Sequence, residues 1–259
     1  MRIMITNDDG ISAEGLTVIH AIACAIAGEE NVWTVAPAFE QSGVGHCISY
    51  TKPMLLTQLG ERRFAVDGSP ADCVLAGLFE VMKDNPPDLI LSGVNRGNNA
   101  AENTLYSGTV GAVIEAAMHQ VKSIALSQYY GPKNRDLPNT FEAACAWGEK
   151  VVRSLIDDAP WHDGPYELFY NVNFPPCPAD GVKGIRAVTQ GWREGIEFSV
   201  DPHTINNRRF LFIKGGPQDQ PTEPGSDVHA NLDDYISVTP MRADLTAHGS
   251  MSRLKDVFS

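Results

Sequence analysis

The sequence predicts an α/β fold with a mostly parallel central β-sheet, and three observations predict it. Apolar runs at residues 1–6, 32–36 and 88–91 have the length and composition of strands buried on both faces. Residues 12–27, between the first two runs, repeat apolar side chains at helical spacing. A strand, a helix and a strand at this spacing form a right-handed βαβ unit, so the two strands lie parallel in one sheet.

Length and composition are those of an ordinary globular protein with one large domain, or one domain and an appendage. The chain has 259 residues, of which 43% are hydrophobic and 20% are charged. Its net charge of −12 argues against binding to a nucleic-acid polymer, which requires clustered Lys and Arg. A small phosphorylated ligand stays compatible with this charge, because a bound metal reverses its sign locally.

The cysteines and apolar segments indicate the compartment. The five cysteines are scattered, odd in number and form no C-x-x-C motif. This pattern disfavours a disulfide framework or a zinc cluster and fits a reducing compartment. No signal-peptide pattern begins the chain, and no apolar run is long enough to span a bilayer. We therefore expect a cytoplasmic protein without membrane association.

Local signals define the elements of the first half of the chain. Ser12 is expected to cap the first helix, and Gly28 is expected to close it. Residues 47–56 and 63–66 are expected to form two shorter strands of a hairpin. Ser69, followed by proline and, three residues on, by aspartate, is a strong N-cap for a helix to about residue 82.

The central strand at 88–91 is expected to end where a polar loop, residues 92–99, begins. The elements expected after this loop are a helix at 110–118, a strand at 123–127, a helix at 143–156 and a strand at 168–173.

The character of the sequence changes at about residue 183. Strand-like pieces at 185–189 and 210–213 are separated by polar sequence, and a Pro/Gly-rich connection follows at 215–225. No hydrophobic face here is able to close a second core, so we expect an extended β-arm that a partner subunit covers. The chain would then consist of a core, residues 1–183, and an arm with an oligomerisation tail, residues 184–259. Within the tail, a strand is expected at 235–239, stopped by Pro240, and a helix at 250–257.

Two adjacent carboxylates, Asp8 and Asp9, follow the first strand, at the sheet edge where α/β proteins bind ligands. Neighbouring carboxylates repel each other unless a cation lies beside them, and oxygen ligands suit hard divalent metals such as Mg²⁺ or Mn²⁺. The segment also suits a simple turn, because Asn-Asp-Asp-Gly is favourable turn chemistry. Both interpretations stay open for this motif alone.

Two further loops are expected at the same edge. Ser42 follows the second strand, where its hydroxyl could bind a metal or an anion or only stabilise a turn. His46, in the same loop, is expected to be packed or hydrogen-bonded rather than to act as a catalytic base. Asn95 and Arg96 follow the central strand. An amide oxygen is a ligand type for hard metals, and a guanidinium pairs with phosphate oxygens.

The helix expected at 110–118 is preceded by Ser107, Gly108 and Thr109. Hydroxyls and free backbone N–H groups at a helix N-terminus form an anion site, and no acidic residue lies in this first turn. Helix capping explains the hydroxyl residues equally well. The glycines that flank Thr109, Gly108 and Gly111, favour a phosphate.

These residues together predict phosphate-ester hydrolysis. A metal held by oxygen ligands can acidify a bound water, polarise the phosphoryl group and orient the leaving oxygen. Arg96 and the helix N-terminus would hold the phosphate beside it. Phosphatases that form an aspartyl-phosphate often place a nucleophile and an acid two residues apart, whereas Asp8 and Asp9 are adjacent. A metal-activated water is therefore favoured over covalent catalysis by Asp8.

Several motifs, in this order and at compatible distances, closely resemble those of the SurE family. They are NDDG at 7–10, QSGVGH at 41–46, GSPADC at 68–73, SGVNRG at 92–97, SGT at 107–109 and, near the end, YISVTP at 235–240. The resemblance implies a three-layer, Rossmann-like fold. It also implies a β-hairpin arm and a C-terminal tail that are exchanged between the subunits of a homodimer or homotetramer.

The resemblance further implies a 5′/3′-nucleotidase that removes phosphate from nucleoside monophosphates with one divalent cation per subunit, with short polyphosphate as a further substrate of some members. Carried over to this sequence, the metal ligands would be Asp8, Asp9, Ser42 and Asn95, and the phosphate would contact Ser107, Gly108 and Thr109. Asp8, Asp9 and Asn95 are the candidate catalytic residues.

Two departures from the family pattern leave the substrate preference open. Ala38-Phe39 stands where a charged pair is frequent, and Asn98-Asn99 where a proline is common. Two other functions also stay open. A nucleotide-binding regulatory protein would use the phosphate site without turnover, although it would not need the carboxylate pair. A structural oligomer would explain the arm but not the loops at the strand ends.

Overall fold

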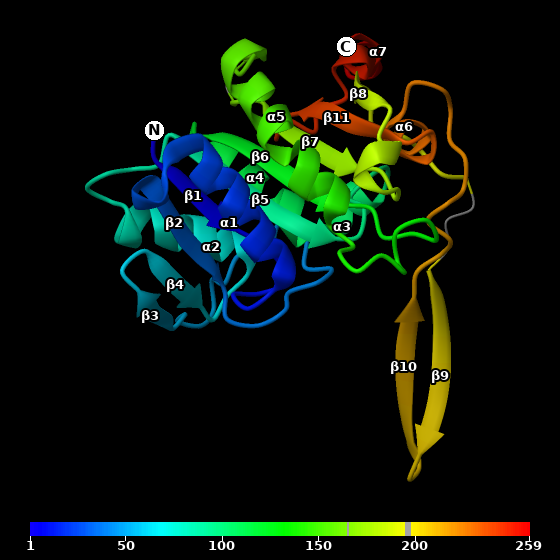
Figure 1. Ribbon diagram of the computed structural model, residues 1–259. Helices are drawn as coiled ribbons and strands as arrows, with labels where there is room; N and C mark the ends of the chain where they lie inside the picture. Colours follow the sequence, from blue (N-terminus) through cyan, green and yellow to red (C-terminus); the bar gives the residue numbers. More distant parts are fainter. Residues whose placement is uncertain (165, 195–197) are drawn as a thin grey trace.

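Nine strands form one sheet in the order β3-β4-β2-β1-β5-β6-β7-β11-β8 (Figure 1). The computed structural model describes residues 1–164, 166–194 and 198–259. The strands from β4 to β7 are parallel neighbours, whereas β3 and β11 run antiparallel to β4 and β7. The bounds of the nine strands are β1 Ile3–Thr6, β2 Val32–Pro37, β3 Leu56–Gly60, β4 Arg63–Val66, β5 Leu89–Arg96, β6 Lys122–Gln128, β7 Phe169–Phe174, β8 Gly184–Ala187 and β11 Tyr235–Met241.

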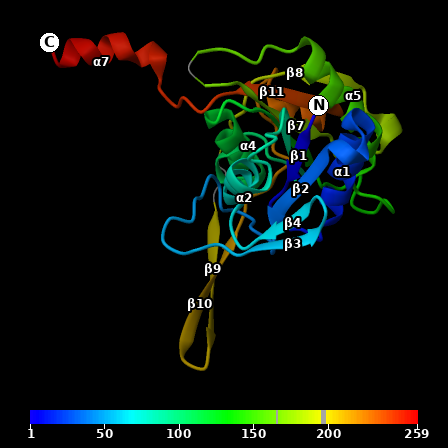
Figure 2. The same ribbon diagram turned by 90° about the vertical axis from the view of Figure 1, so that its left-hand side faces the viewer.

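Helices cover both faces of this sheet, as Figure 2 shows. The alternation of side chains along β1 explains the two layers: Ile3 and Ile5 pack with α1 and α5, and Met4 packs with α2 and α4. The α-helices are α1 Glu14–Ala27, α2 Pro70–Ala76, α3 Asn103–Tyr106, α4 Gly108–Met118, α5 Glu142–Asp158, α6 Asp227–Leu232 and α7 Met251–Val257. The shorter helical turns are Glu29–Asn31, Gly77–Val81, Ala179–Gly181 and His248–Ser250. No helix in the described part of the chain is long and apolar enough to cross a bilayer.

Of the predicted caps of the first two helices, those at Gly28 and Ser69 are correct and the one at the start of α1 is not; α2 ends at Ala76, and the separate helical turn Gly77–Val81 follows it. Gly28, with φ of 84°, closes α1, and its N–H donates to the carbonyl of Cys24. Ser69 and Asp72 form the expected capping box at α2. The residue at the N-cap of α1 is Ala13, without a side-chain cap, so the prediction for Ser12 is wrong. Ser12 lies one residue too early, in the turn that the Ala13 N–H closes on the carbonyl of Gly10.

Three strand predictions need correction. The hairpin of β3 and β4 is present, but β3 begins only at Leu56, and residues 47–55 form a loop. Strand β5 does not end at Leu91 but continues to Arg96, with a register shift against β6. Pro240 lies within β11 instead of stopping it. Because β8 pairs with β11 only as far as Val238, no strand on that side needs the N–H that proline lacks.

The segment 184–259 is only partly an arm. Its strands β8 and β11 belong to the main sheet. The main sheet therefore contains strands from both sides of residue 183. A separate hairpin of β9 Ser199–Ile205 and β10 Arg208–Lys214 projects away from the sheet (Figures 1 and 2). Positive φ angles at Asn206 and Asn207 form the tight turn between these strands, a signal that could have predicted β9. The helix α7 was expected, whereas α6 was not.

Candidate active site

The carboxyl ends of β1, β2 and β5 meet at one edge of the sheet and open into a cavity of about 480 Å³. Parallel strands place their following loops on the same side, which explains why residues far apart in the sequence meet there. The cavity is lined by Asp8, Asp9, Glu40, Ser42, Gly43, Asn95, Arg96, Gly97, Asn98, Asn99, Asn103, Tyr106, Ser107 and Phe198. The structure therefore brings together six of the eight predicted site residues as lining residues, and the other two, Gly108 and Thr109, lie directly behind Asp8.

Asp8 is held by the first turn of α4. Its Oδ1 accepts a hydrogen bond from Thr109 Oγ1 at 2.6 Å, and its Oδ2 accepts one from the Thr109 backbone N–H at 3.2 Å. A Cβ atom at Gly108 would lie 2.9 Å from the Cβ of Asp8, so only glycine permits this close approach. Ser107 is the N-cap, and its Oγ accepts from the Val110 N–H. Thr109 thus uses both of its donors on the carboxylate and positions it.

Asp9 and the residues around it also line the cavity. Asp9 Oδ2 accepts from the Arg96 backbone N–H at 3.3 Å, while the Arg96 guanidinium lies 4.8 Å from the ring centroid of Tyr130. Ser42 Oγ donates to Glu40 Oε1 at 2.8 Å. Asn95 Nδ2 donates to the carbonyl of Gly97 at 2.9 Å, which leaves the amide oxygen as the free end of the group.

The electrostatics of the two carboxylates fit a bound cation. Burial, opposed by the Thr109 hydrogen bond and assisted by Asp9, raises the pKa of Asp8 to about 6. The pKa of Asp9 is also raised, mainly by burial and further by the charge of Glu40, and this rise is opposed by the backbone N–H and the positive charge of Arg96. In the described ranges, no Lys, Arg or His side chain forms an ion pair with either carboxylate. A buried carboxylate, Asp8, beside a partly buried one, Asp9, with no ion pair to either in the described residues, favours a divalent cation.

The candidate ligand set is chemically mixed. Across residues 1–164, 166–194 and 198–259, no group of three or more His, Cys, Asp and Glu side chains is arranged to bind a metal ion. The set at this cavity instead combines two carboxylates with a hydroxyl and an amide oxygen. Oxygen ligands of these kinds suit Mg²⁺ and Mn²⁺ better than metals that prefer sulfur or imidazole.

Comparison with known proteins identifies the family. The model of the family "Survival protein SurE" matches residues 3–197. The chain belongs to the SurE family. The 5′-nucleotidase SurE of Roseobacter denitrificans is 64% identical over 99% of both chains, and that of Ruegeria pomeroyi is 62% identical over 98% of this chain and 99% of its own.

Comparison with solved structures confirms the predicted fold of this SurE-family chain. The crystal structure of the SurE protein from Aquifex aeolicus superposes with a TM-score of 0.82, with 30% sequence identity and 100% coverage of both chains. The Rossmann-like α/β fold with a mostly parallel sheet and a separate hairpin is therefore established.

The structure adds cavity residues that the sequence did not single out. Glu40 comes from the loop after β2, and Asn103 and Tyr106 are the first and last residues of the short helix α3. Phe198 lies at the start of the hairpin arm and reaches the cavity of this SurE-family chain from the far end of the sequence. No local signal could have predicted Phe198, because its position depends on the path of the arm.

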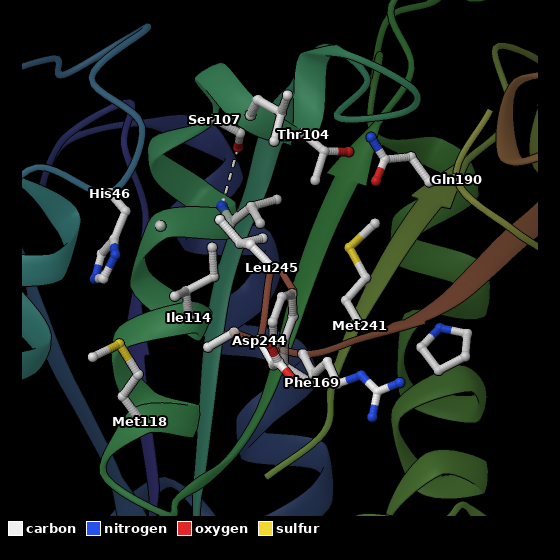
Figure 3. Close-up of a pocket in the computed structure, with 16 residues that line it drawn as sticks. His46, Thr104, Ser107, Ile114, Met118, Phe169, Gln190, Met241, Asp244 and Leu245 are labelled. Atoms are coloured by element: carbon white, nitrogen blue, oxygen red, sulfur yellow. Dashed lines mark hydrogen bonds between the residues drawn. The ribbon is translucent and has the colours of Figure 1, made fainter. Parts of the chain in front are cut away.

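A second cavity, of about 520 Å³, is lined along α4 from Ser107 to Met118 (Figure 3) and shares only Ser107 with the first. Its lining is mainly apolar and includes Ile114, Met118, Met241 and Leu245. His46 lies at its side, and its Nε2 is 2.6 Å from Glu115 Oε2. His46 is thus a hydrogen-bonded residue outside the carboxylate cavity, as expected.

Proposed function

We propose that this chain is a metal-dependent phosphomonoesterase that hydrolyses nucleoside 5′- or 3′-monophosphates to nucleoside and phosphate. One observation carries the proposal: the buried carboxylate of Asp8 and the partly buried carboxylate of Asp9, neither in an ion pair within the described residues, line a cavity at the N-terminus of helix α4. The names of the relatives, 5′-nucleotidase SurE, support the same activity.

Asp8, Asp9, Ser42 and Asn95 would hold one divalent cation per subunit, with Mg²⁺ or Mn²⁺ preferred for an all-oxygen set. Such a cation would supply a water molecule of lowered pKa and would neutralise charge on the phosphoryl group. Asp8 and Asp9 are the candidate catalytic residues together with Asn95, because all three line the cavity at the strand ends.

The phosphate group would lie between Arg96 and the first turn of α4. Ser107 lines the cavity there, and no acidic residue in the first turn of α4 opposes an anion. Gly108 and Thr109 would support Asp8 more than they contact the phosphate. Gly108 allows the helix to approach Asp8 closely, and Thr109 donates hydrogen bonds to its carboxylate. This arrangement fixes Asp8 in position before the substrate arrives.

Covalent catalysis by Asp8 is less favoured than attack by water. Both carboxylate oxygens of Asp8 already accept hydrogen bonds from Thr109, and the side chain is only 4% exposed. A carboxylate has about four lone-pair sites, so Asp8 can still bind a cation, whereas in-line attack requires an oxygen that the Thr109 hydrogen bonds do not already orient.

The test is phosphate release from a panel of nucleoside monophosphates, first with EDTA and then with added Mg²⁺ or Mn²⁺. We expect release to vanish with the chelator and to return with metal. Short polyphosphate belongs in the same panel as a possible side substrate. If folded protein binds nucleotides but releases no phosphate with any metal, a non-catalytic nucleotide-binding regulatory protein becomes the better proposal.

We further propose that the arm and the tail join subunits into a homodimer or homotetramer. Strand β10 exposes Phe210 and Phe212 on one face and Leu211 and Ile213 on the other. An isolated two-stranded hairpin is marginally stable in water, so apolar side chains on both of its faces support coverage by a partner. Replacing Phe210 and Phe212 by serine should reduce the molar mass measured by light scattering, and an unchanged mass would argue against this contact.

A cytoplasmic location is proposed from the thiols. All five cysteines are free, and Cys73 and Cys177 are buried. Free cysteines fit a reducing compartment. Fractionation of the source cells, with an antibody to the chain, tests this location.

A further inference from the structure

We propose that Tyr106 and Phe198 form a base-binding subsite, in which the two aromatic rings contact the nucleobase of the substrate. This inference rests on the proposed function and deepens it, because it makes the base, and not only the phosphate ester, part of what the cavity recognises.

The two rings form one unit on the wall of the carboxylate cavity. Their centroids are 5.2 Å apart, and their planes cross at 79°. Both residues line the same cavity as Asp8 and Asp9. They come from different parts of the chain, since Tyr106 ends α3 and Phe198 precedes β9.

The rings are exposed inside a cavity that is otherwise polar. Tyr106 is 48% and Phe198 is 49% exposed, and neither belongs to one of the hydrophobic clusters of the core. Two exposed aromatic rings in contact with each other inside a ligand-sized cavity offer a surface on which a base can stack. The remaining lining is carboxylate, amide, hydroxyl and guanidinium groups, so these rings are the aromatic part of the wall.

The position of the pair matches the layout of a nucleotide. Tyr106 directly precedes Ser107, the N-cap residue at the candidate phosphate position. A ligand with its phosphate at the α4 N-terminus would therefore place the sugar and base next to Tyr106. The cavity of about 480 Å³ falls within the usual range for small-ligand sites and extends beyond the space that a phosphate alone would fill.

Stacking on the two rings would favour ligands that carry a base, with little preference for one base over another. Every base has a π-face, so stacking on aromatic rings tolerates different bases. We therefore expect a broad range of nucleoside monophosphates as substrates, with the larger purines favoured over pyrimidines because they cover more ring surface.

The first experiment compares adenosine 5′-monophosphate with ribose 5-phosphate, which has the same phosphate ester but no base. We expect kcat/KM for the nucleotide, relative to ribose 5-phosphate, to fall about 5- to 150-fold in a Tyr106→Ala, Phe198→Ala double variant. Tyr106→Phe should keep the wild-type ratio, because it keeps the ring. Tyr50→Ala removes an aromatic side chain that is 89% exposed outside the cavity, and this matched control should also keep the ratio.

A second measurement does not depend on turnover. Adenosine and ribose are titrated calorimetrically into the wild-type protein and the double variant in the presence of Mg²⁺. We expect adenosine, but not ribose, to bind the wild type measurably more tightly than the variant. Circular dichroism and the melting temperature establish that each variant is folded.

The outcomes separate this proposal from the proposed function. An unchanged substrate ratio in the folded double variant, with unchanged adenosine binding, would overturn the base subsite while leaving the phosphatase intact. If the wild type hydrolyses neither substrate, the proposed function fails, and the adenosine titration still decides whether the rings bind a base.

Discussion

Asp8, which contacts the first turn of α4, and Glu115, which lies within α4, are both buried, yet their surroundings shift their pKa values in opposite directions. Asp8 is 4% exposed, and burial raises its pKa to about 6. Glu115 is 6% exposed, but hydrogen bonds and charges from His46 and His119 lower its pKa. The Glu115 oxygens lie 2.6 Å from His46 Nε2 and 2.9 Å from His119 Nε2.

The difference teaches how to separate a structural carboxylate from a functional one. Glu115 has partners within the fold and ties the loop that contains His46 to the middle of α4. Asp8 receives only neutral donors from Thr109. A buried carboxylate with no cation in the fold is costly unless a cation is supplied from solution. We therefore expect the reaction to take place beside Asp8, at the N-terminus of α4.

The largest expected effect comes from removing the charge of Asp8. Asp8→Asn should lower metal-dependent phosphate release on the order of 1000-fold, because the metal contributes several kcal/mol of charge stabilisation in the transition state. The fold should survive, since asparagine is nearly isosteric with aspartate. Phosphate release and the melting temperature check both points. Retention of metal-dependent activity would remove Asp8 from the proposed metal site.

Metal should stabilise the wild-type protein but not Asp8→Asn. A cation that binds only the folded state adds about 2.7 kcal/mol to the free energy of unfolding at a concentration 100 times its Kd. Urea unfolding with EDTA and with increasing Mg²⁺ or Mn²⁺ measures this gain. Equal gains in the two proteins would mean that the cation binds elsewhere.

Glu115→Gln should affect stability rather than chemistry. Losing the charge between His46 and His119 should lower the free energy of unfolding by about 1–3 kcal/mol, the usual cost of removing a charged hydrogen-bond partner. Urea unfolding at neutral pH measures the loss, and phosphate release should change far less than in Asp8→Asn. A stability equal to that of the wild type would show that the two histidines do not need this carboxylate.

The smallest expected effect is the pH dependence of this stabilisation. Because the folded protein lowers the pKa of Glu115, its carboxylate stabilises the fold above the unfolded pKa of about 4.3. That stabilisation is lost as the pH falls through the lower folded pKa. The gap in unfolding free energy between wild type and Glu115→Gln should therefore shrink between about pH 5 and pH 3. A gap that widens on acidification would contradict the direction of the shift.

The sequence by itself determined the features that depend on neighbouring residues. The strand that precedes Asp8 and Asp9, the capping box at Ser69 and the helix N-terminus at residues 107–109 all follow from residues within a few positions of each other. Hydrophobic periodicity and capping are local physics, so they are readable without a structure. The parallel order of the first strands also followed, because a βαβ crossover has one hand.

Only the tertiary structure decided how distant residues meet. It directs both Thr109 donors at Asp8, pairs Glu115 with His46 and brings Phe198 beside Tyr106. It also places β8 and β11 in the main sheet and lets Pro240 lie within a strand. These features depend on long-range packing and on which backbone groups find partners, and no local pattern of residues encodes that information.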